Sequence, residues 1–286
     1  MTMDQLINVL VTITLVELMV AIGLGVALAD LAGVATNGRL MGQAALANYV
    51  CVPAAAVGLL LLFRPEPMVA AGFLIAAVCP GAPYGPPFTA MAKGSVAVSV
   101  GLMVVLAGSS ALLAPLLLHW LLPLLTPGSE SLNVDVTKMV FTLLAVQLLP
   151  LCVGLTVRQW RPKLAARLSK PANLLSVVLN MSVIGLVLVV HFQTLVVIRP
   201  RGFAGMLALV LAALIAGWLL GMPGSSNRKA MAITTSVRNV GVSLVIATGS
   251  FAGTPAVTAT LAFALFQTIL LALVALGWGR LAPITC

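Results

Sequence analysis

The chain has 286 residues, of which 61% are hydrophobic and only 7% are charged, and its mean hydropathy is +1.17. A soluble domain of this length has no interior large enough for so much apolar surface, so the composition indicates an integral membrane protein. The net charge of +9 is scattered over short segments and is not gathered with aromatic residues, so we do not expect nucleic acid as a partner.

A transmembrane helix needs about 20 predominantly apolar residues. The sequence contains nine such runs, near 5–29, 40–63, 68–92, 95–125, 137–157, 172–198, 202–222, 229–250 and 255–279. Prolines, glycines and charged residues separate them, for example in RQWRPKLAARLSKP at 158–171, as expected of turns. The N-terminus lacks the features of a cleaved signal peptide, so we expect the first run to be retained. The prediction is an all-α membrane protein with nine transmembrane helices in one transmembrane domain over 1–286.

Basic residues predict the orientation of these helices, because cytoplasmic loops of membrane proteins are enriched in Lys and Arg. Nine spans put the two termini on opposite sides of the bilayer. Ten basic residues fall on the side of the C-terminus and four on the other, while Arg238 lies inside a span. We therefore predict a cytoplasmic C-terminus and an N-terminus outside. The short chain suggests a bacterial inner membrane.

Two predicted spans are interrupted by residues that do not suit a membrane helix. CPGAPYGPPFTAMAKG at 79–94 is rich in proline and glycine, and ITTSVRNVGVS at 233–243 combines hydroxyls, an amide, a glycine and an arginine. Irregular backbone at membrane depth is tolerated only where it is buried in protein or lines a cavity. A proline kink alone would be a harmless alternative for the first stretch. Two interruptions, one in each half, are typical of inverted-repeat transporters that bind substrate where the broken helices cross.

These stretches carry a resemblance to a known family. CPGAPYGPPFTAMAKGSVAVSVGL is similar to the CPGG…N…YLAKGD-ALSV signature of the bile acid:sodium symporter family, AITTSVRNVGVS resembles its AIE-G-QN-GL signature, and MVAIGLGVALADLAGV resembles its first well-marked segment. The resemblance implies an inverted-repeat fold with two crossing broken helices, a panel domain and a core domain. It assigns 5–29, 137–157 and 172–198 to the panel, and 40–63, 68–92, 95–125, 202–222, 229–250 and 255–279 to the core.

The chain departs from the family pattern at the residues that the family uses for sodium. Thr234 stands at the position of a glutamate, and Arg238 at that of a glutamine. Gly85 and Pro86 match the family's Ser-Asn pair. Ser99 is kept, and Asn48 replaces a glutamine but could still ligate a cation. Sodium coupling is therefore not expected from most of this site.

We predict that Arg238 stands in for a sodium ion as a tethered cation, which either stabilises the crossover or holds an anionic substrate. Asn239 keeps the family's substrate-facing asparagine. Other groups around the two interruptions are expected to contact the substrate, namely Thr234, Thr235, Ser236, Thr89, Pro83 and Tyr84.

Glu17 is the one acid well inside a predicted span, so it is a candidate partner for Arg238 or a candidate proton carrier. An ion pair between them could close the cleft and be broken by an anion. Alternatively, Glu17 lies near the outer interface and has no such role. Polar residues within spans, including Gln147, Asn180 and Gln267, are expected chiefly to form interhelical hydrogen bonds.

The sequence thus predicts a secondary transporter of a small organic anion that works by alternating access, without a bound cofactor. A sodium symporter that uses Asn48 and Ser99, a proton-coupled carrier that uses Glu17, and a channel or sensor on the same fold are the alternatives. The sequence shows no phosphate loop, HExxH motif or nucleophile elbow, so we do not expect an enzyme. The substrate and the oligomeric state are not indicated.

Overall fold

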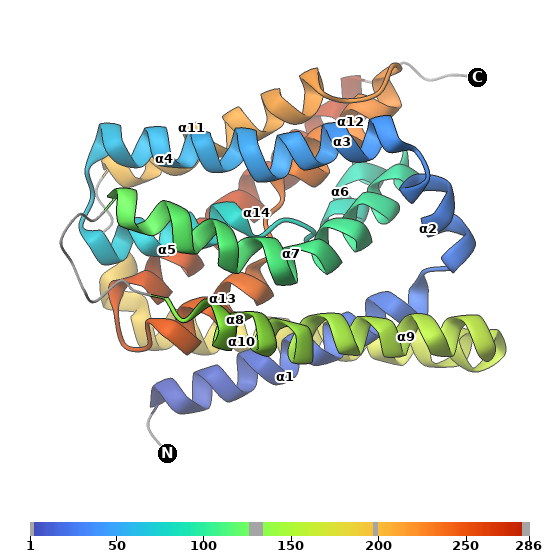
Figure 1. The fold of residues 1–286 in the computed structure, drawn as a ribbon, viewed down its shortest axis with the longest axis horizontal. Coiled ribbons are helices and arrows are strands. Elements are labelled where there is room, and N and C mark those ends of the chain that lie inside the picture. The colour runs from blue at the N-terminus through green and yellow to red at the C-terminus, as the bar shows by residue number, and fades with distance from the viewer. Residues whose placement is uncertain (1–2, 126–133, 197–199, 282–286) are drawn as a thin grey trace.

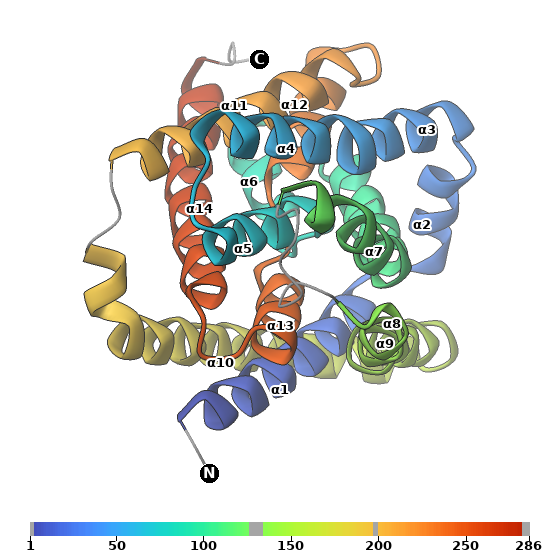
Figure 2. The ribbon, with the colours of Figure 1, turned by 60° about the vertical axis from the view of Figure 1, so that its left-hand side comes forward.

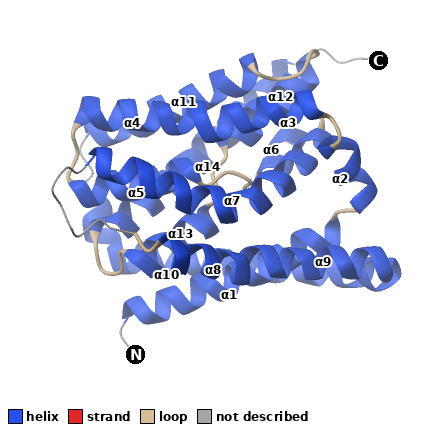
Figure 3. Cartoon of the chain, in the orientation of Figure 1, coloured by secondary structure: helices blue, strands red, loops and turns tan. Residues whose placement is uncertain are grey.

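The structure is a computed structural model that describes residues 3–125, 134–196 and 200–281. Every regular element among these residues is a helix (Figure 3). In chain order the elements are α1 (Met3–Gly25), α2 (Leu28–Ala35), α3 (Gly38–Leu46), the π-helical turn η1 (Ala47–Cys51), α4 (Val52–Phe63), α5 (Pro67–Val78), α6 (Gly85–Met91), α7 (Val96–Leu125), α8 (Val136–Leu143), the π-helical turn η3 (Leu144–Leu148), α9 (Leu149–Trp160), α10 (Pro162–Val196), α11 (Pro200–Leu219), α12 (Ser225–Ser236), α13 (Val240–Ser250) and α14 (Pro255–Leu281).

Seven stretches of the described chain are long and apolar enough to cross a membrane. They are Gln5–Gly25, Gly38–Phe63, Val96–Leu125, Val136–Trp160, Pro200–Leu219, Ser225–Ser250 and Pro255–Arg280. The predicted all-α membrane protein is confirmed, and each of these stretches overlaps one predicted span. The other two predicted spans fall on the interrupted pair α5–α6 and on α10. The count of nine transmembrane helices therefore stays a prediction.

The helices form three layers when the molecule is viewed as in Figures 1 and 2. α1, α8, α9 and α10 make one outer layer, α3, α4, α11 and α12 make the other, and α5, α6, α7, α13 and α14 lie between them. α1 packs against both α9 and α10. The contact with α9 is close because two glycines face each other: a Cβ added at Gly154 would lie 2.4 Å from the Val20 carbonyl oxygen and 2.9 Å from the Gly23 Cα. Small residues allow this approach between membrane helices.

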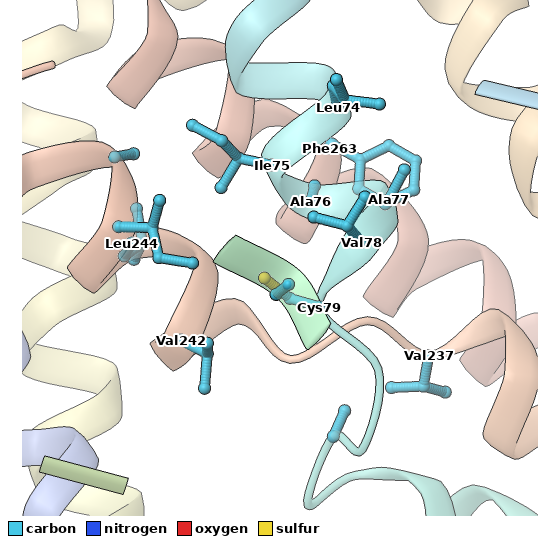
Figure 4. Close-up of a cluster of buried hydrophobic side chains, with 14 of the residues drawn as sticks. Leu74, Ile75, Ala76, Ala77, Val78, Cys79, Val237, Val242, Leu244 and Phe263 are labelled. Carbon is cyan, nitrogen blue, oxygen red and sulfur yellow. The ribbon is translucent and has the colours of Figure 1, made fainter. Parts of the chain in front are cut away.

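The hydrophobic core is centred on the short helices of the middle layer. Residues 70–78 of α5 are all buried, and so are residues 242–248 of α13. A helix that is apolar on every side has no face suited to water, so it is stable in the interior of the protein. Figure 4 shows Leu74, Val78 and Leu244 in this cluster, close to the end of α5 and the start of α13. The interrupted helices are thereby enclosed by the rest of the molecule.

Two short segments differ from the predicted turns. Residues 162–171 were expected in a loop, but α10 begins at Pro162 and continues through them. The reason is that proline suits the first helical position, and KLAARL is made of good helix formers. The segment after the first predicted span also contains the additional short helix α2.

Candidate functional site

The two predicted interruptions meet in the middle layer. α5 ends at Val78 and α6 begins at Gly85, while α12 ends at Ser236 and α13 begins at Val240. The non-helical segments between them pass next to each other near Cys79 and Val237 (Figure 4). The Asn239 N–H donates to the Cys79 carbonyl oxygen at 2.8 Å, so the two segments share a main-chain hydrogen bond. We call the segments 79–84 and 237–239 the crossover. A simple proline kink is wrong for the first interruption, because six residues leave the helix.

The first crossover segment has its shape because of Gly81. Its φ is +83°, a conformation that favours glycine, and a Cβ at this position would lie 2.2 Å from the Ala107 backbone nitrogen of α7. The Gly81 carbonyl oxygen accepts a hydrogen bond of 3.2 Å from Asn239 Nδ2. Asn239 Oδ1 in turn accepts from the Val242 N–H and caps the start of α13. Asn239 therefore joins the two segments through Nδ2 and caps α13 through Oδ1.

Arg238 lies at the centre of the crossover and is 1% exposed. Its guanidinium donates from Nη2 to Asn48 Oδ1 at 2.9 Å and from Nη1 to the Ala77 carbonyl oxygen at 3.2 Å, while Nε has no hydrogen-bond partner. Its backbone exchanges two hydrogen bonds of 3.0 Å with the side chain of Gln267 in α14. The groups that hold this guanidinium are thus neutral oxygens and not a carboxylate.

Helix dipoles supply the negative potential that a buried guanidinium requires. α5 and α12 are each 12 residues long and both end at the crossover, so their negative ends point toward it. A helix C-terminus carries about half a negative elementary charge, and two of them sum to about one. Ala77 is the penultimate residue of α5, and its carbonyl belongs to that negative end. Arg238 therefore lies against the negative end of α5, while the positive ends of α6 and α13 begin on the other side of the crossover.

Three predicted hydroxyls form a buried chain beside the crossover. Thr89 donates to Ser99 Oγ at 3.0 Å, and Ser99 shares a hydrogen bond of 2.9 Å with Thr234. Gly85 lies next to them, because a Cβ there would be 3.6 Å from Ser99 Oγ. The structure brings together α6, α7 and α12 at this point. Pro86 is buried at the start of α6.

The other predicted polar residues are distributed around this centre. Asn48 lies in η1, and besides accepting from Arg238 it donates from Nδ2 to Thr235 Oγ1 at 3.3 Å. Ser236 donates within its own helix, to the Ala232 carbonyl oxygen. Tyr84 accepts a hydrogen bond from Asn180 of α10, next to the half-buried Pro83.

Glu17 does not pair with Arg238 in this structure. Its Oε2 accepts a 2.6 Å hydrogen bond from Ser176 of α10, and its Oε1 is buried without a partner. The predicted ion pair fails because the guanidinium is already held by Asn48 and Ala77. Glu17 and Ser176 instead join α1 to α10 within one outer layer.

A transition-metal centre is not indicated within the described ranges, where no group of three or more His, Cys, Asp or Glu residues converges. The oxygens of Ser99, Thr234 and Asn48 that would suit a small cation already take part in hydrogen bonds with other protein groups. The arrangement holds the guanidinium of Arg238 as its cation.

Sequence comparison extends the resemblance of the two broken helices to most of the chain. The model of the Sodium Bile acid symporter family matches residues 12–199. The chain belongs to this family. It is therefore a transporter and not an enzyme, and it is embedded in a membrane.

Members of the family with curated descriptions include bacterial and plant proteins. The uncharacterized sodium-dependent transporter YocS of Bacillus subtilis is 26% identical over 244 residues, which cover 82% of this chain and 72% of YocS. The probable sodium/metabolite cotransporter BASS2 of rice chloroplasts is 27% identical over 60% of this chain and 39% of its own length. The corresponding BASS1 of Arabidopsis thaliana is 28% identical over 51% of this chain and 35% of its own length.

Two contributors to the site had no clear signal in the sequence. The Ala77 carbonyl oxygen, which accepts from Arg238, is a backbone group that any residue would supply. Gln267 was expected to form an interhelical hydrogen bond, which is confirmed, but its partner is the backbone of the crossover. An amide inside an otherwise apolar span was the only sign that the sequence offered for this second contact.

Proposed function

We propose that this family member is a secondary transporter of a small organic anion and that it works by alternating access without a sodium ion at the crossover. The observation that carries the proposal is the buried guanidinium of Arg238, bonded to Asn48 and to the carboxyl end of α5. Broken helices of transporters use such ends to coordinate coupling cations. Here a covalently attached cation occupies this position.

Electrostatics argues against a second cation close to Arg238. Two unit charges about 4 Å apart repel by roughly 4 kcal/mol at an effective dielectric constant of 20. That energy corresponds to about a thousandfold loss of affinity. Thr234, at the position of the family's glutamate, adds no negative charge to offset it. Two relatives are named as a sodium-dependent transporter and a sodium/metabolite cotransporter. We propose that this chain differs from them because it does not bind sodium at the crossover.

An anion would find positive potential at the same place. Arg238 Nε is free of hydrogen bonds, and the positive end of α13 begins beside it at Asn239. If a substrate carboxylate displaced the Asn48 side chain as the hydrogen-bond partner of Arg238, the guanidinium could bind the anion through two parallel hydrogen bonds. Asn239 and the hydroxyls of Thr234, Thr235, Ser236 and Thr89 are the other proposed contacts. For access to alternate, the layer with α1, α9 and α10 would act as the panel and move against the core.

Thermal unfolding of the purified full-length protein tests this proposal first. Sodium is titrated against potassium at constant ionic strength, and we expect the unfolding midpoint to be the same in both salts. Small carboxylates are then added to the protein and to Arg238→Gln. A carboxylate at one hundred times its Kd stabilises the native state by about 2.7 kcal/mol, and we expect this effect only in the unmodified protein. A saturable, sodium-specific rise in midpoint would refute the absence of a sodium site.

Uptake into proteoliposomes tests transport itself. The carboxylate that gives the largest stabilisation is supplied outside, and saturable uptake is expected in potassium as well as in sodium. Arg238→Gln should abolish it, while Arg228→Gln, which removes an exposed arginine of α12, should not. Binding without flux would instead indicate a sensor, and flux without saturation a channel.

Proton coupling through Glu17 is a second candidate, supported by the buried and unpartnered Oε1 of its carboxyl group. A proton on this oxygen would remove the charge that burial disfavours. Uptake driven by an inwardly directed proton gradient, with the acidic side outside the liposomes, should then be lost in Glu17→Gln. Glu66→Gln, which changes an exposed carboxylate, should leave it intact. Gradient-driven uptake that persists in Glu17→Gln would reject this candidate.

A further inference from the structure

A cavity lies away from the crossover, at the end of the molecule where α4 ends and α5, α11 and α14 begin. Its volume is about 610 Å³. This is within the range of about 300–1,000 Å³ that is typical of small-molecule sites. None of the residues proposed to bind the transported anion lines it, so it is a separate site.

The cavity has an apolar interior and a charged rim. Its deeper walls include Leu60, Phe73, Met206 and Ala262. Phe73 is six residues into α5 and Ala262 is seven into α14, and at 1.5 Å per residue the apolar part extends roughly 10 Å from the helix starts. The rim consists of the residues that connect or begin these helices. An apolar interior with a charged rim suits a ligand that has a hydrocarbon part and a polar end.

The charges on the rim favour an anionic polar end. Arg64 and Arg201 both line the cavity, and Glu66 is the acidic residue beside them. All three are exposed. Two guanidinium groups and one carboxylate give the rim a net positive charge. Arginine is well suited to phosphate, which it can bind through two parallel hydrogen bonds.

We propose that this cavity binds an anionic phospholipid, with one acyl chain between α5, α11 and α14 and the phosphate at Arg64 and Arg201. The ends of membrane-spanning helices lie at the level of the lipid headgroups, which puts the rim where phosphates are abundant. The orientation predicted from the basic residues assigns this end to the outer leaflet. The proposal does not depend on the identity of the transported substrate.

Lipid titration of the detergent-purified protein tests the site. Thermal unfolding is followed with phosphatidylglycerol, with phosphatidylcholine of the same acyl chains, and with the free fatty acid. Phosphatidylglycerol should raise the midpoint saturably, and the other two should do so much less. Equal stabilisation by phosphatidylcholine would refute recognition of the negative charge. Stabilisation by the fatty acid alone would refute a phospholipid as the occupant.

Variants of the rim and of the interior locate the binding. Arg64 has φ +44°, so Arg64→Asn is chosen because asparagine tolerates this conformation, and it is combined with Arg201→Gln. Each basic residue near an anionic lipid is worth about fivefold in affinity, so the double variant should bind phosphatidylglycerol roughly thirtyfold more weakly. The control Arg39→Asn combined with Arg167→Gln removes two exposed arginines that do not line the cavity and should bind normally.

Gly205→Leu provides an independent test of the acyl-chain position. Gly205 lines the cavity, and a Cβ there would meet only Phe63 at an ordinary 3.7 Å, so the larger side chain can extend into the empty space. This variant should lose the response to phosphatidylglycerol while its midpoint without lipid stays close to that of the unmodified protein. Unchanged lipid affinity in both this variant and the double arginine variant would overturn the proposal.

Discussion

Replacement of Gly81 by alanine tests whether the crossover is built as described. Alanine must adopt φ near +83° there, which costs about 1–2 kcal/mol in the left-handed region. Its Cβ would lie 2.2 Å from the nitrogen and 2.6 Å from the Cα of Ala107. These are backbone atoms of α7, so they cannot rotate away, and overpacking of this kind costs about 1–3 kcal/mol. Together the terms predict a loss of about 2–5 kcal/mol of stability.

Thermal unfolding in detergent at a fixed scan rate measures this loss. With roughly 2–4 °C for each kcal/mol, the midpoint of Gly81→Ala should fall by about 4–20 °C. Gly58→Ala is the matched control, because Gly58 lies inside α4, is exposed and has no atom within 4 Å of an added Cβ. This control should be neutral or more stable by about 0.5–1 kcal/mol, since alanine is the better helix former. If Gly81→Ala unfolds at the same temperature as Gly58→Ala, the close contact between the crossover and α7 does not exist.

Three further predictions concern the polar contacts of the site. Asn239→Ala should destabilise the protein by about 2–4 kcal/mol, because it removes a helix cap and leaves the buried Gly81 carbonyl oxygen unpaired. The control Asn37→Ala removes only the exposed cap of α3 and should cost about 1 kcal/mol in the same unfolding assay. Tyr84→Phe removes only the hydrogen bond from Asn180 and should cost about 1 kcal/mol of stability. Tyr49→Phe removes hydrogen bonds to the Leu106 carbonyl oxygen and to Ser109 and should cost more. A larger loss of stability in Tyr84→Phe than in Tyr49→Phe would contradict the assigned contacts. Thr234→Glu combined with Arg238→Gln changes the local charge by two units and should produce a sodium-specific rise in the unfolding midpoint. Thr234→Glu alone should not produce it, because the guanidinium can pair with the new carboxylate. If the double variant shows no sodium response, residues other than these two also exclude the ion.

The sequence alone predicted the membrane location, the two interrupted helices and the polar residues gathered around them. These properties depend on local composition. A long run of apolar residues indicates a membrane span, and a cluster of proline and glycine indicates backbone that cannot remain helical. The resemblance to the family also came from such short stretches, and two of them, at 19–34 and 79–102, lie within the residues that the family model matches.

The partners of those residues were decided only by the tertiary structure. Arg238 bonds Asn48 and Ala77, which are 190 and 161 residues away along the chain. The sequence offered Glu17 as the natural partner because it is the one acid within a span, yet the structure holds the guanidinium with an amide oxygen and a helix end. A backbone carbonyl has no signature in a sequence, and a helix dipole depends on where the helix ends in space. For the same reason the cavity between α4, α5, α11 and α14 could not be foreseen, since its apolar residues are ordinary members of four separate spans.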